Sequence, residues 1–491
     1  MAGVPWRRPP VAVSGFTALA VLAVLAAACG RGDPTVPDAA VESTTTTTVA
    51  TTSTVSTTAT VTQPPLPPAS PGVCPTIPAP AAPDPARPVY DVVANVDVPG
   101  GIAEGTVTVR FIPDLPTDVL VFRLWPAAPR PARAGTTVDT GAVTTDAGAT
   151  LESIRPDPTS LHVAIGRTVA AGEAITVTVP FRVAVGGAVD DRVSLDRDTL
   201  RLGSFVPLLA WEPGVGWSLE PPTAGFAETV SSPAADWTLT INQTAGYDVL
   251  ATGRRDPDGV WRGTALRDVA ASFGHFNVVT SIEQLPGPVE VTVGVDRSVG
   301  EDPTAYLNRA VSALRDFAQR FGPYPWDTYT LAITPGLGGG IEFPTHVMQG
   351  PGTSGRTTPH EVAHMWFYAL AGDNQGRDPW LDEGLASYAE FRHEGTVDAA
   401  RGRSIPSDAR GRVGAPMSYW ESHLDSYYRG VYVQGAVAMA SLGRLDLVDC
   451  ALRLYVAREA FGIARPAALI EAMTVVFPDA AAQLAPFGIT P

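Results

Sequence analysis

The feature that most constrains this chain is the segment 360–364, with the sequence His-Glu-Val-Ala-His, together with a carboxylate that follows it. Histidines at positions i and i+4 lie one turn apart on the same face of a helix, so both imidazoles can reach one metal ion. The absence of Gly and Pro from 361 to 370 favours a helix here. Glu383 follows His364 after eighteen residues, within a second helical pattern. A shared metal site would therefore require two helices to lie side by side.

The donor set of these two segments suits a catalytic metal. His360, His364 and Glu383 would hold a zinc ion and leave a fourth position for water, as catalytic rather than structural zinc sites do. The carboxylate of Glu361 projects beside the histidines, where it can accept a proton from that water. The alternative, a surface helix with two unrelated histidines, leaves the spacing to Glu383 unexplained.

Two further polar residues lie on the same predicted helix as Glu383. Ser387 and Glu390 follow it at i+4 and i+7, on one helical face. Because hydrogen bonds from neighbouring side chains often orient metal-binding histidines, both residues are candidates for that role. The alternative is that they are ordinary polar positions on a helix face.

These motifs in combination resemble a known family. Residues 380–388, Trp-Leu-Asp-Glu-Gly-Leu-Ala-Ser-Tyr, together with 360–364, resemble the aminopeptidase N family of gluzincin zinc metallopeptidases. Residues 339–343, Gly-Gly-Ile-Glu-Phe, are similar to that family's Gly-x-Met-Glu-Asn motif, and 431–436 to its Val-Tyr-x-x-Gly-Ala segment. A weaker similarity, at 235–253, is to strands of the family's N-terminal β domain. The resemblance extends from about residue 88 to residue 491.

The resemblance implies a role for each matching residue. Glu342 would bind the free α-amine of a peptide, and Gly339 and Gly340 would let the backbone approach the substrate. Tyr432 would donate its hydroxyl to the oxyanion that develops on the scissile carbonyl. Glu361 would be the general base of a hydrolysis that uses one zinc ion and acts on peptides with a free N-terminus.

The chain also departs from the family pattern. Phe343 stands where the family has Asn, so we expect altered contacts with the substrate. The family's second amine-binding acid has no clear match, and Glu228 is the nearest candidate. Tyr427 and Tyr428 are rivals of Tyr432 if the register differs. We expect a short form without the family's large C-terminal helical-repeat domain, and therefore a more open cleft.

Two patterns divide the body of the chain near residue 286. Residues 90–283 consist of short runs of alternating apolar and polar residues, such as 105–111, 174–180 and 236–242, which predict antiparallel sheet without helices. Residues 303–321 then show helical spacing and end before a Gly, a strand is predicted at 329–333, and the chain after 358 is mostly helical. With the resemblance, this predicts an all-β saddle domain at 89–285, followed by a thermolysin-like α+β catalytic domain at 286–491.

The N-terminus has the pattern of an export signal. Arg7 and Arg8 precede an uncharged apolar run, 11–28, that ends in small residues directly before Cys29. This resembles the bacterial lipoprotein box, so we predict a signal peptide at 1–28, a lipid on Cys29 and anchoring at the extracytoplasmic face of a bacterial membrane. An uncleaved anchor and an ordinary cleaved signal are the alternatives. Residues 29–88 are rich in Thr and Pro and predict a disordered stalk.

The remaining features concern cross-links and partners. Cys74 and Cys450 either pair, as cysteines of exported proteins often do, or stay free thiols. The net charge of −16, from 34 basic and 50 acidic residues, argues against a nucleic-acid partner, which would require a basic face. We expect a monomer.

Together these patterns predict a lipid-anchored zinc aminopeptidase that hydrolyses the N-terminal peptide bond. Two alternatives stay open. A zinc metalloendopeptidase would use the same metal without depending on the substrate amine. A non-catalytic peptide-binding lipoprotein would keep the fold but predicts a damaged catalytic set, whereas every expected catalytic residue type is present.

Overall fold

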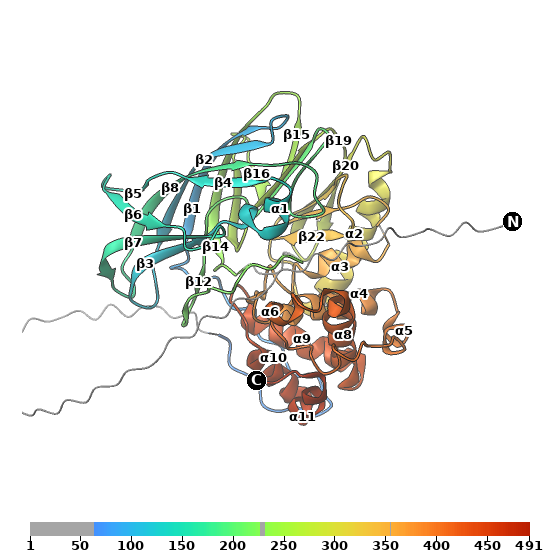
Figure 1. The fold of residues 1–491 in the computed structure, drawn as a ribbon. Coiled ribbons are helices and arrows are strands. Elements are labelled where there is room, and N and C mark those ends of the chain that lie inside the picture. The colour runs from blue at the N-terminus through green and yellow to red at the C-terminus, as the bar shows by residue number, and fades with distance from the viewer. Residues whose placement is uncertain (1–62, 226–230, 354) are drawn as a thin grey trace, which may run out of the picture. The chain divides into compact units, whose positions relative to one another are not determined.

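The computed structural model describes residues 63–225, 231–353 and 355–491 (Figure 1). The predicted signal peptide at 1–28, its lipidation site Cys29, the stalk up to residue 62 and the candidate acid Glu228 lie outside these ranges. Within the described ranges, no helix is both long and apolar enough to span a membrane.

The first part of the described chain is built almost entirely of strands (Figure 1). Their bounds are β1 Val89–Asp97, β2 Ile102–Phe111, β3 Thr117–Arg123, β4 Thr137–Thr140, β5 Val143–Thr145, β6 Thr150–Ile154, β7 Ser160–Val169, β8 Ile175–Ala184, β9 Val193–Asp196, β10 Thr199–Gly203, β11 Leu208–Leu209, β12 Trp211–Glu212, β13 Gly216–Trp217, β14 Ala235–Gln243, β15 Asp248–Ala251, β16 Arg254–Arg255, β17 Trp261–Leu266 and β18 Ala270–Gly274. The largest sheet has 12 strands in the order β11-β3-β7-β6-β5-β8-β2-β1-β14-β17-β16, with β4 paired to β8. Two smaller sheets have the orders β15-β18-β10-β9 and β12-β13.

Apolar and polar residues alternate along these strands, as predicted, so one face of the strands is buried. Along β8, buried and half-buried residues alternate at every position. β1 and β14 pair in parallel, and there Tyr90 stacks on Trp237 with ring centroids 3.9 Å apart. The sequence predicted no helix in this region, but a short turn η1 (Trp125–Ala127) and helix α1 (Pro129–Arg133) interrupt the strands. Proline in the first turn of each favours this start.

A second sheet follows, with five strands. They are β19 Phe276–Gln284, β20 Pro288–Asp296, β21 Thr328–Ile333, β22 Gly340–Phe343 and β23 His346–Gln349, in the order β19-β20-β21-β23-β22. The sheet thus begins at Phe276, before the residue at which the sequence patterns divide. Helix α2 spans Pro303–Phe321, as predicted, and begins where Asp302 accepts a hydrogen bond from the Thr304 N–H at 2.9 Å. The strand predicted at 329–333 is also confirmed, as β21.

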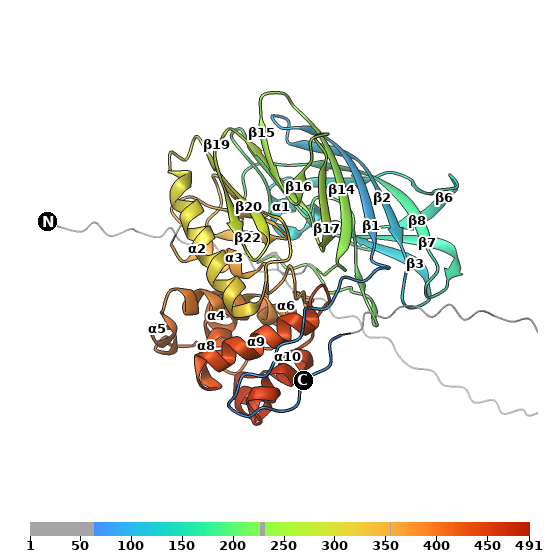
Figure 2. The ribbon, with the colours of Figure 1, turned by 180° about the vertical axis from the view of Figure 1, so that it is seen from behind.

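The rest of the chain is mostly helical, as predicted (Figure 2). The elements are α3 Thr357–Ala363, η2 Pro379–Leu381, α4 Glu383–His393, α5 Val397–Arg401, α6 Met417–Trp420, α7 Leu424–Tyr427, η3 Tyr428–Val433, α8 Gln434–Ser441, α9 Leu445–Glu459, α10 Pro466–Val476, α11 Ala480–Leu484 and η4 Ala485–Phe487. One hydrophobic core joins these helices to the five-stranded sheet and includes the fully buried Trp366, Trp380 and Trp420. The fold is therefore a large β-sheet part followed by a part rich in helices. Its description as saddle and thermolysin-like domains stays a prediction.

The helix of the first metal-binding segment is shorter than the sequence suggested. No Gly or Pro interrupts 361–370, but α3 ends at Ala363. Tyr368 adopts a positive φ of 135°, and the N–H of Ala369 donates to the carbonyl of His364, so the chain turns back. His364 nevertheless keeps helical dihedral angles and stays on the face of His360.

Residues 63–88 differ from the predicted stalk. They cross the helical part (Figure 2), where the N–H groups of Ser70 and Ala81 donate to carbonyls of α10 and α9 at 2.8 Å. Cys74 forms a disulfide with Cys450 of α9, with Cα atoms 5.8 Å apart. The prediction of disorder was wrong for these residues, because a covalent link, backbone hydrogen bonds and the packing of Ile77 and Ala81 on the helical core hold them in place.

Candidate metal centre and substrate cavity

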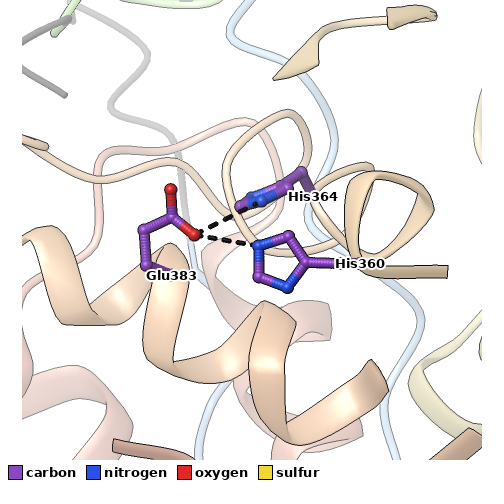
Figure 3. Close-up of side chains that lie close together, drawn as sticks. All are labelled: His360, His364 and Glu383. Carbon is purple, nitrogen blue, oxygen red and sulfur yellow. Dashed lines mark hydrogen bonds and ion pairs between the residues drawn. The ribbon is translucent and has the colours of Figure 1, made fainter. Parts of the chain in front are cut away.

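Three buried side chains from two adjacent helices converge on one point (Figure 3). His360 and His364 come from α3 and the residue after it, and Glu383 is the first residue of α4. The Oε2 atom of Glu383 lies 3.0 Å from Nε2 of His360 and 3.6 Å from Nε2 of His364. Tetrahedral zinc with bonds of about 2.0–2.1 Å separates its ligand atoms by about 3.3 Å. The three residues therefore fit a zinc ion in both donor type and spacing.

The electrostatics of the cluster also favour a cation. Burial alone would lower the pKa of His360, but the carboxylates of Glu383, Glu390 and Glu361 outweigh burial and raise that pKa well above its usual value. Burial would raise the pKa of Glu383, yet nearby histidines, His364 first, lower it overall. Since both shifts reflect stabilised positive charge between the ligands, a divalent cation suits the same position.

Two further carboxylates contact the Nδ1 atoms of the candidate ligand histidines. Nδ1 of His364 is hydrogen-bonded to the buried carboxylate of Asp382. Nδ1 of His360 lies 3.5 Å from an oxygen of Glu390, as the sequence suggested for that residue. Ser387 is buried on α4, and the described part of the chain shows no hydrogen bond between its hydroxyl and either histidine. Its orienting role stays a prediction.

A chain of hydrogen bonds connects the metal ligands to Glu342. The amide nitrogen of Gln375 donates to Oε1 of Glu342 at 3.0 Å and to Oδ2 of Asp382 at 2.7 Å. Asp382 in turn binds His364. Sequence reasoning missed both linking residues. Asp382 adjoins the ligand Glu383 and could have been weighed, whereas Gln375 lies in a loop with no motif around it.

Glu361 lies in the position expected of a proton acceptor. Its side chain lines the cavity, and its Oε2 atom has no hydrogen-bond partner among the described residues. Burial raises its pKa to about 8, and the nearby carboxylates of Glu342 and Glu383 act in the same direction, against the histidines. Burial thus favours the protonated form of this carboxyl, which is the form it would have after accepting a proton.

The first residue of strand β22, Gly340, brings the backbone close to this carboxylate. A Cβ atom on Gly340 would lie 2.4 Å from the Oε1 atom of Glu361, so only glycine fits there. A Cβ on Gly339 would have nothing within 4 Å, so no described atom requires glycine at that position. Phe343 is fully buried in a cluster with Leu337 and Met348 and is not among the described residues that line the cavity, so the expectation of altered substrate contact stays a prediction.

Tyr432 lies on an irregular turn of the helical part. The segment η3 is π-helical, a form that often marks functional positions. The ring of Tyr432 stacks on His360 at 5.5 Å, and its hydroxyl is hydrogen-bonded to Glu383. Of its two sequence rivals, Tyr428 also lines the cavity, while Tyr427 is buried behind it. Tyr432 is therefore the tyrosine in contact with the metal ligands.

The cavity has a volume of about 360 Å³ and draws residues from both parts of the fold. The β-sheet part contributes Arg130, Asp190, Asp191 and Arg192. Asp190 accepts a hydrogen bond from the Gly338 N–H at 2.9 Å. The buried guanidinium of Arg201 donates to the carbonyls of Val189 at 2.7 Å and Pro335 at 2.5 Å. These contacts fix the wall of the cavity to the turn that precedes Glu342.

Comparisons with known proteins are consistent with this geometry. No protein-family model matches the chain. The chain is 31% identical over 103 residues to aminopeptidase RNPEPL1 of Mus musculus and of Homo sapiens. The match spans 18% of this chain and only 14% of the length of these curated relatives.

Solved structures match over most of the chain. The M1 zinc metallopeptidase of Deinococcus radiodurans is similar with a TM-score of 0.61 and 18% identity, over 82% of this chain and 95% of that enzyme. A mutant of that enzyme bound to a Tyr-Ser-Ala substrate matches with a TM-score of 0.60 and 18% identity, over the same shares of the two chains. A two-domain M1 zinc metallopeptidase mutant bound to L-tryptophan gives 0.61 and 18%, over 82% of this chain and 94% of that one. The chain therefore has the fold of M1 zinc metallopeptidases.

Proposed function

We propose that this protein is a zinc-dependent aminopeptidase that removes the first residue from peptides with a free N-terminus. The observation that carries the proposal is the position of Glu342. Its carboxylate lines the same cavity as the three candidate ligands, within 4.8 Å of ligand atoms of Glu361 and His364. A carboxylate so close to a metal site can hold an ammonium group and place the first peptide bond at the metal.

The candidate ligands imply one cofactor. His360, His364 and Glu383 would hold a single zinc ion. When bound there, zinc supplies Lewis-acid polarisation of the scissile carbonyl and lowers the pKa of a water molecule.

Residues of the chain would carry out the remaining steps, which are proton transfer, stabilisation of the oxyanion and orientation of the site. Glu361 accepts a proton from the attacking water at its Oε2 atom and returns it to the leaving amine. Tyr432 donates its hydroxyl to the developing oxyanion, as an oxyanion-hole donor does. Gln375 and Asp382 orient Glu342 and His364 relative to each other, so the amine site and the metal site keep a fixed separation.

The test uses the full-length protein and one set of peptides in paired free and N-acetylated forms. Products are identified by mass spectrometry, with and without a zinc chelator and with zinc added back. We expect stepwise, chelator-sensitive loss of N-terminal residues from the free forms only. The Glu361→Gln protein, purified in parallel, controls for contaminating peptidases.

Other outcomes would replace the proposal. Internal cleavage of both peptide forms would indicate a metalloendopeptidase and remove the role given to Glu342. No cleavage of either form by a zinc-loaded protein would favour the non-catalytic peptide-binding alternative. In the Glu342→Ala variant we expect a raised KM for free-amine peptides, and an unchanged KM would contradict the amine contact.

We also propose, from the sequence alone, that the protein is exported and lipid-anchored through Cys29 at the extracytoplasmic face of a bacterial membrane. The observation that motivates this is the apolar run that ends directly before that residue. Mass spectrometry of the N-terminal fragment should show a lipid on Cys29. Release of the Cys29→Ala variant from the membrane fraction would support the proposal, and an unmodified N-terminus would contradict it.

A further inference from the structure

Among the residues that the structure describes, three arginines line the cavity, and they come from both parts of the fold. Of its arginines, Arg130 and Arg192 come from the β-sheet part and interact with the charge of Asp191. Arg356 comes from the other part of the fold, directly before α3. A cation there is unexpected in a site built to hold an ammonium group, because most of the lining charges around the metal position are carboxylates.

Glu342, Arg356 and the three candidate metal ligands line the same cavity. A carboxylate oxygen of Glu342 is within 4.8 Å of a ring nitrogen of His364. Glu390 lies 3.5 Å from Nδ1 of His360 and accepts a hydrogen bond from Nε of Arg356. A peptide whose amine contacts Glu342, with its first peptide bond at the metal, therefore has its second residue in a cavity that Arg356 also lines.

The guanidinium of Arg356 is held in place before any substrate arrives. Glu390 binds its Nε edge, and its Nη2 atom lies 3.4 Å from the hydroxyl of Tyr428. Its central carbon lies 5.3 Å from the ring centroid of Phe391. The side chain is still 43% exposed, and a guanidinium has five N–H donors, so these contacts leave donors for a further carboxylate.

We propose that Arg356 binds a carboxylate on the residue that follows the scissile bond. This inference rests on the proposed aminopeptidase function and specifies its substrates. One residue spans about 3.3–3.6 Å, and a charged hydrogen bond adds about 2.8 Å. Arg356 lines the cavity that holds Glu342 and the candidate metal ligands, so its free N–H donors are available to a carboxylate of that second residue. The preferred substrates are thus dipeptides with a free C-terminus and peptides whose second residue is Asp or Glu.

The experiment compares four substrates that share the same first residue. Leu-Ala and Leu-Ala-amide differ only in the C-terminal carboxylate, and Leu-Asp-amide and Leu-Asn-amide differ only in the side-chain carboxylate. We expect kcat/KM to be about tenfold higher for the carboxylate member of each pair, which corresponds to about 1.4 kcal/mol. A preference within the first pair alone would assign the site to dipeptides, and one within the second pair alone to acidic second residues.

Variants then locate the source of the preference. Arg356→Gln should reduce both ratios to near one, while Arg356→Lys should keep part of the preference because it keeps the charge. Arg403 is the matched control, because it lies 5.4 Å from the Phe391 ring and donates to the Tyr428 hydroxyl but does not line the cavity. Arg403→Gln should leave both ratios as in the wild type.

A binding measurement separates recognition from turnover. In the Glu361→Gln protein, calorimetry should show tighter binding of Leu-Ala than of Leu-Ala-amide, and the difference should vanish when Arg356→Gln is added. Equal cleavage and equal binding within both pairs would overturn this inference and leave the aminopeptidase function intact. An equal loss of preference in Arg403→Gln would overturn the assignment to Arg356. No cleavage of any of the four substrates would overturn the proposed function and this inference with it.

Discussion

Asp382 makes a sharp test of how the site is held together, because it contacts the candidate metal ligand His364 on one side and, through Gln375, the proposed amine-binding residue Glu342 on the other. The substitution Asp382→Asn keeps the shape of the side chain and can still accept a hydrogen bond from Nδ1 of His364. It removes the negative charge, however, and points an amide NH₂ at the NH₂ of Gln375, which now lies 2.7 Å from Oδ2 of Asp382. If Gln375 turns over to relieve this clash, its oxygen then faces the carboxylate of Glu342.

The magnitude follows from these two losses. Mutation of a residue that hydrogen-bonds a metal-binding histidine, here with loss of its negative charge, typically lowers metal affinity by about 10- to 100-fold, or about 1.4–2.7 kcal/mol. A buried polar group left without its partner costs about 1–3 kcal/mol more. Because Asp382 and Gln375 are 0% and 1% exposed, water cannot compensate inside the described structure. We therefore expect zinc affinity to fall and the KM for free-amine peptides to rise in the same variant.

Zinc affinity would be measured on apoprotein by competition with a chromophoric chelator, and KM at saturating zinc. Circular dichroism would check that the variant is folded. Ser387→Ala is the comparison, since that side chain is buried on α4, which follows Asp382 directly, and makes no hydrogen bond to either histidine within the described structure. Its zinc affinity should stay within about twofold of the wild type. Wild-type zinc affinity and wild-type KM in Asp382→Asn would refute the coupling of the two sites.

Three further predictions concern separate parts of the structure. Glu361→Gln should lower kcat by about 10²–10⁴-fold while the zinc content, measured by elemental analysis, stays at the wild-type level; loss of zinc would contradict its role as a base. Burial raises the pKa of Glu459 to about 7, so the stability that its proton contributes is complete below about pH 4.5 and is lost as the pH rises through 7. Glu459→Gln should therefore raise the melting temperature at pH 8.5 but not at pH 4, and an equal change at both would refute this. A Cβ on Gly203 would lie 2.3 Å from the ring of Phe343, so Gly203→Ala should destabilise the fold by about 1–3 kcal/mol. Adding Phe343→Leu should restore part of the lost stability. A neutral effect of Gly203→Ala in thermal unfolding would show that the ring has room to move.

Sequence reasoning located some residues from local spacing and others from their resemblance to a family motif. His360 and His364 are one helical turn apart, so periodicity places both on one face of a helix. Glu383 was located by its motif, because its position beside them depends on the packing of α4 against α3. Gln375, which joins Glu342 to Asp382, could not be found this way. Its position depends on how β22 and α4 pack, and no periodic pattern in the sequence encodes that contact.

The predicted stalk shows a different limit of sequence reasoning. Composition measures how much apolar surface a segment can bury, and residues 63–88 have little. Their order comes from one disulfide between Cys74 and Cys450, from backbone hydrogen bonds to α9 and α10, and from the few apolar residues, Ile77 and Ala81, that pack on the helical core. Those contacts depend on a surface 376 residues away in the sequence, which composition cannot register.

The departure at Phe343 shows how a substituted motif position can still support the site. Successive side chains of a strand point to opposite faces, so the face on which Phe343 is buried determines the face that Glu342 presents. The Phe343 ring packs with Met348 and against Gly203 of β10, which anchors β22 to the β-sheet part by apolar contact. Glu342 is thereby directed into the cavity, where Gln375 binds its carboxylate. The apolar residue thus sets the orientation of Glu342, the proposed amine-binding residue, although it is not among the described residues that line the cavity.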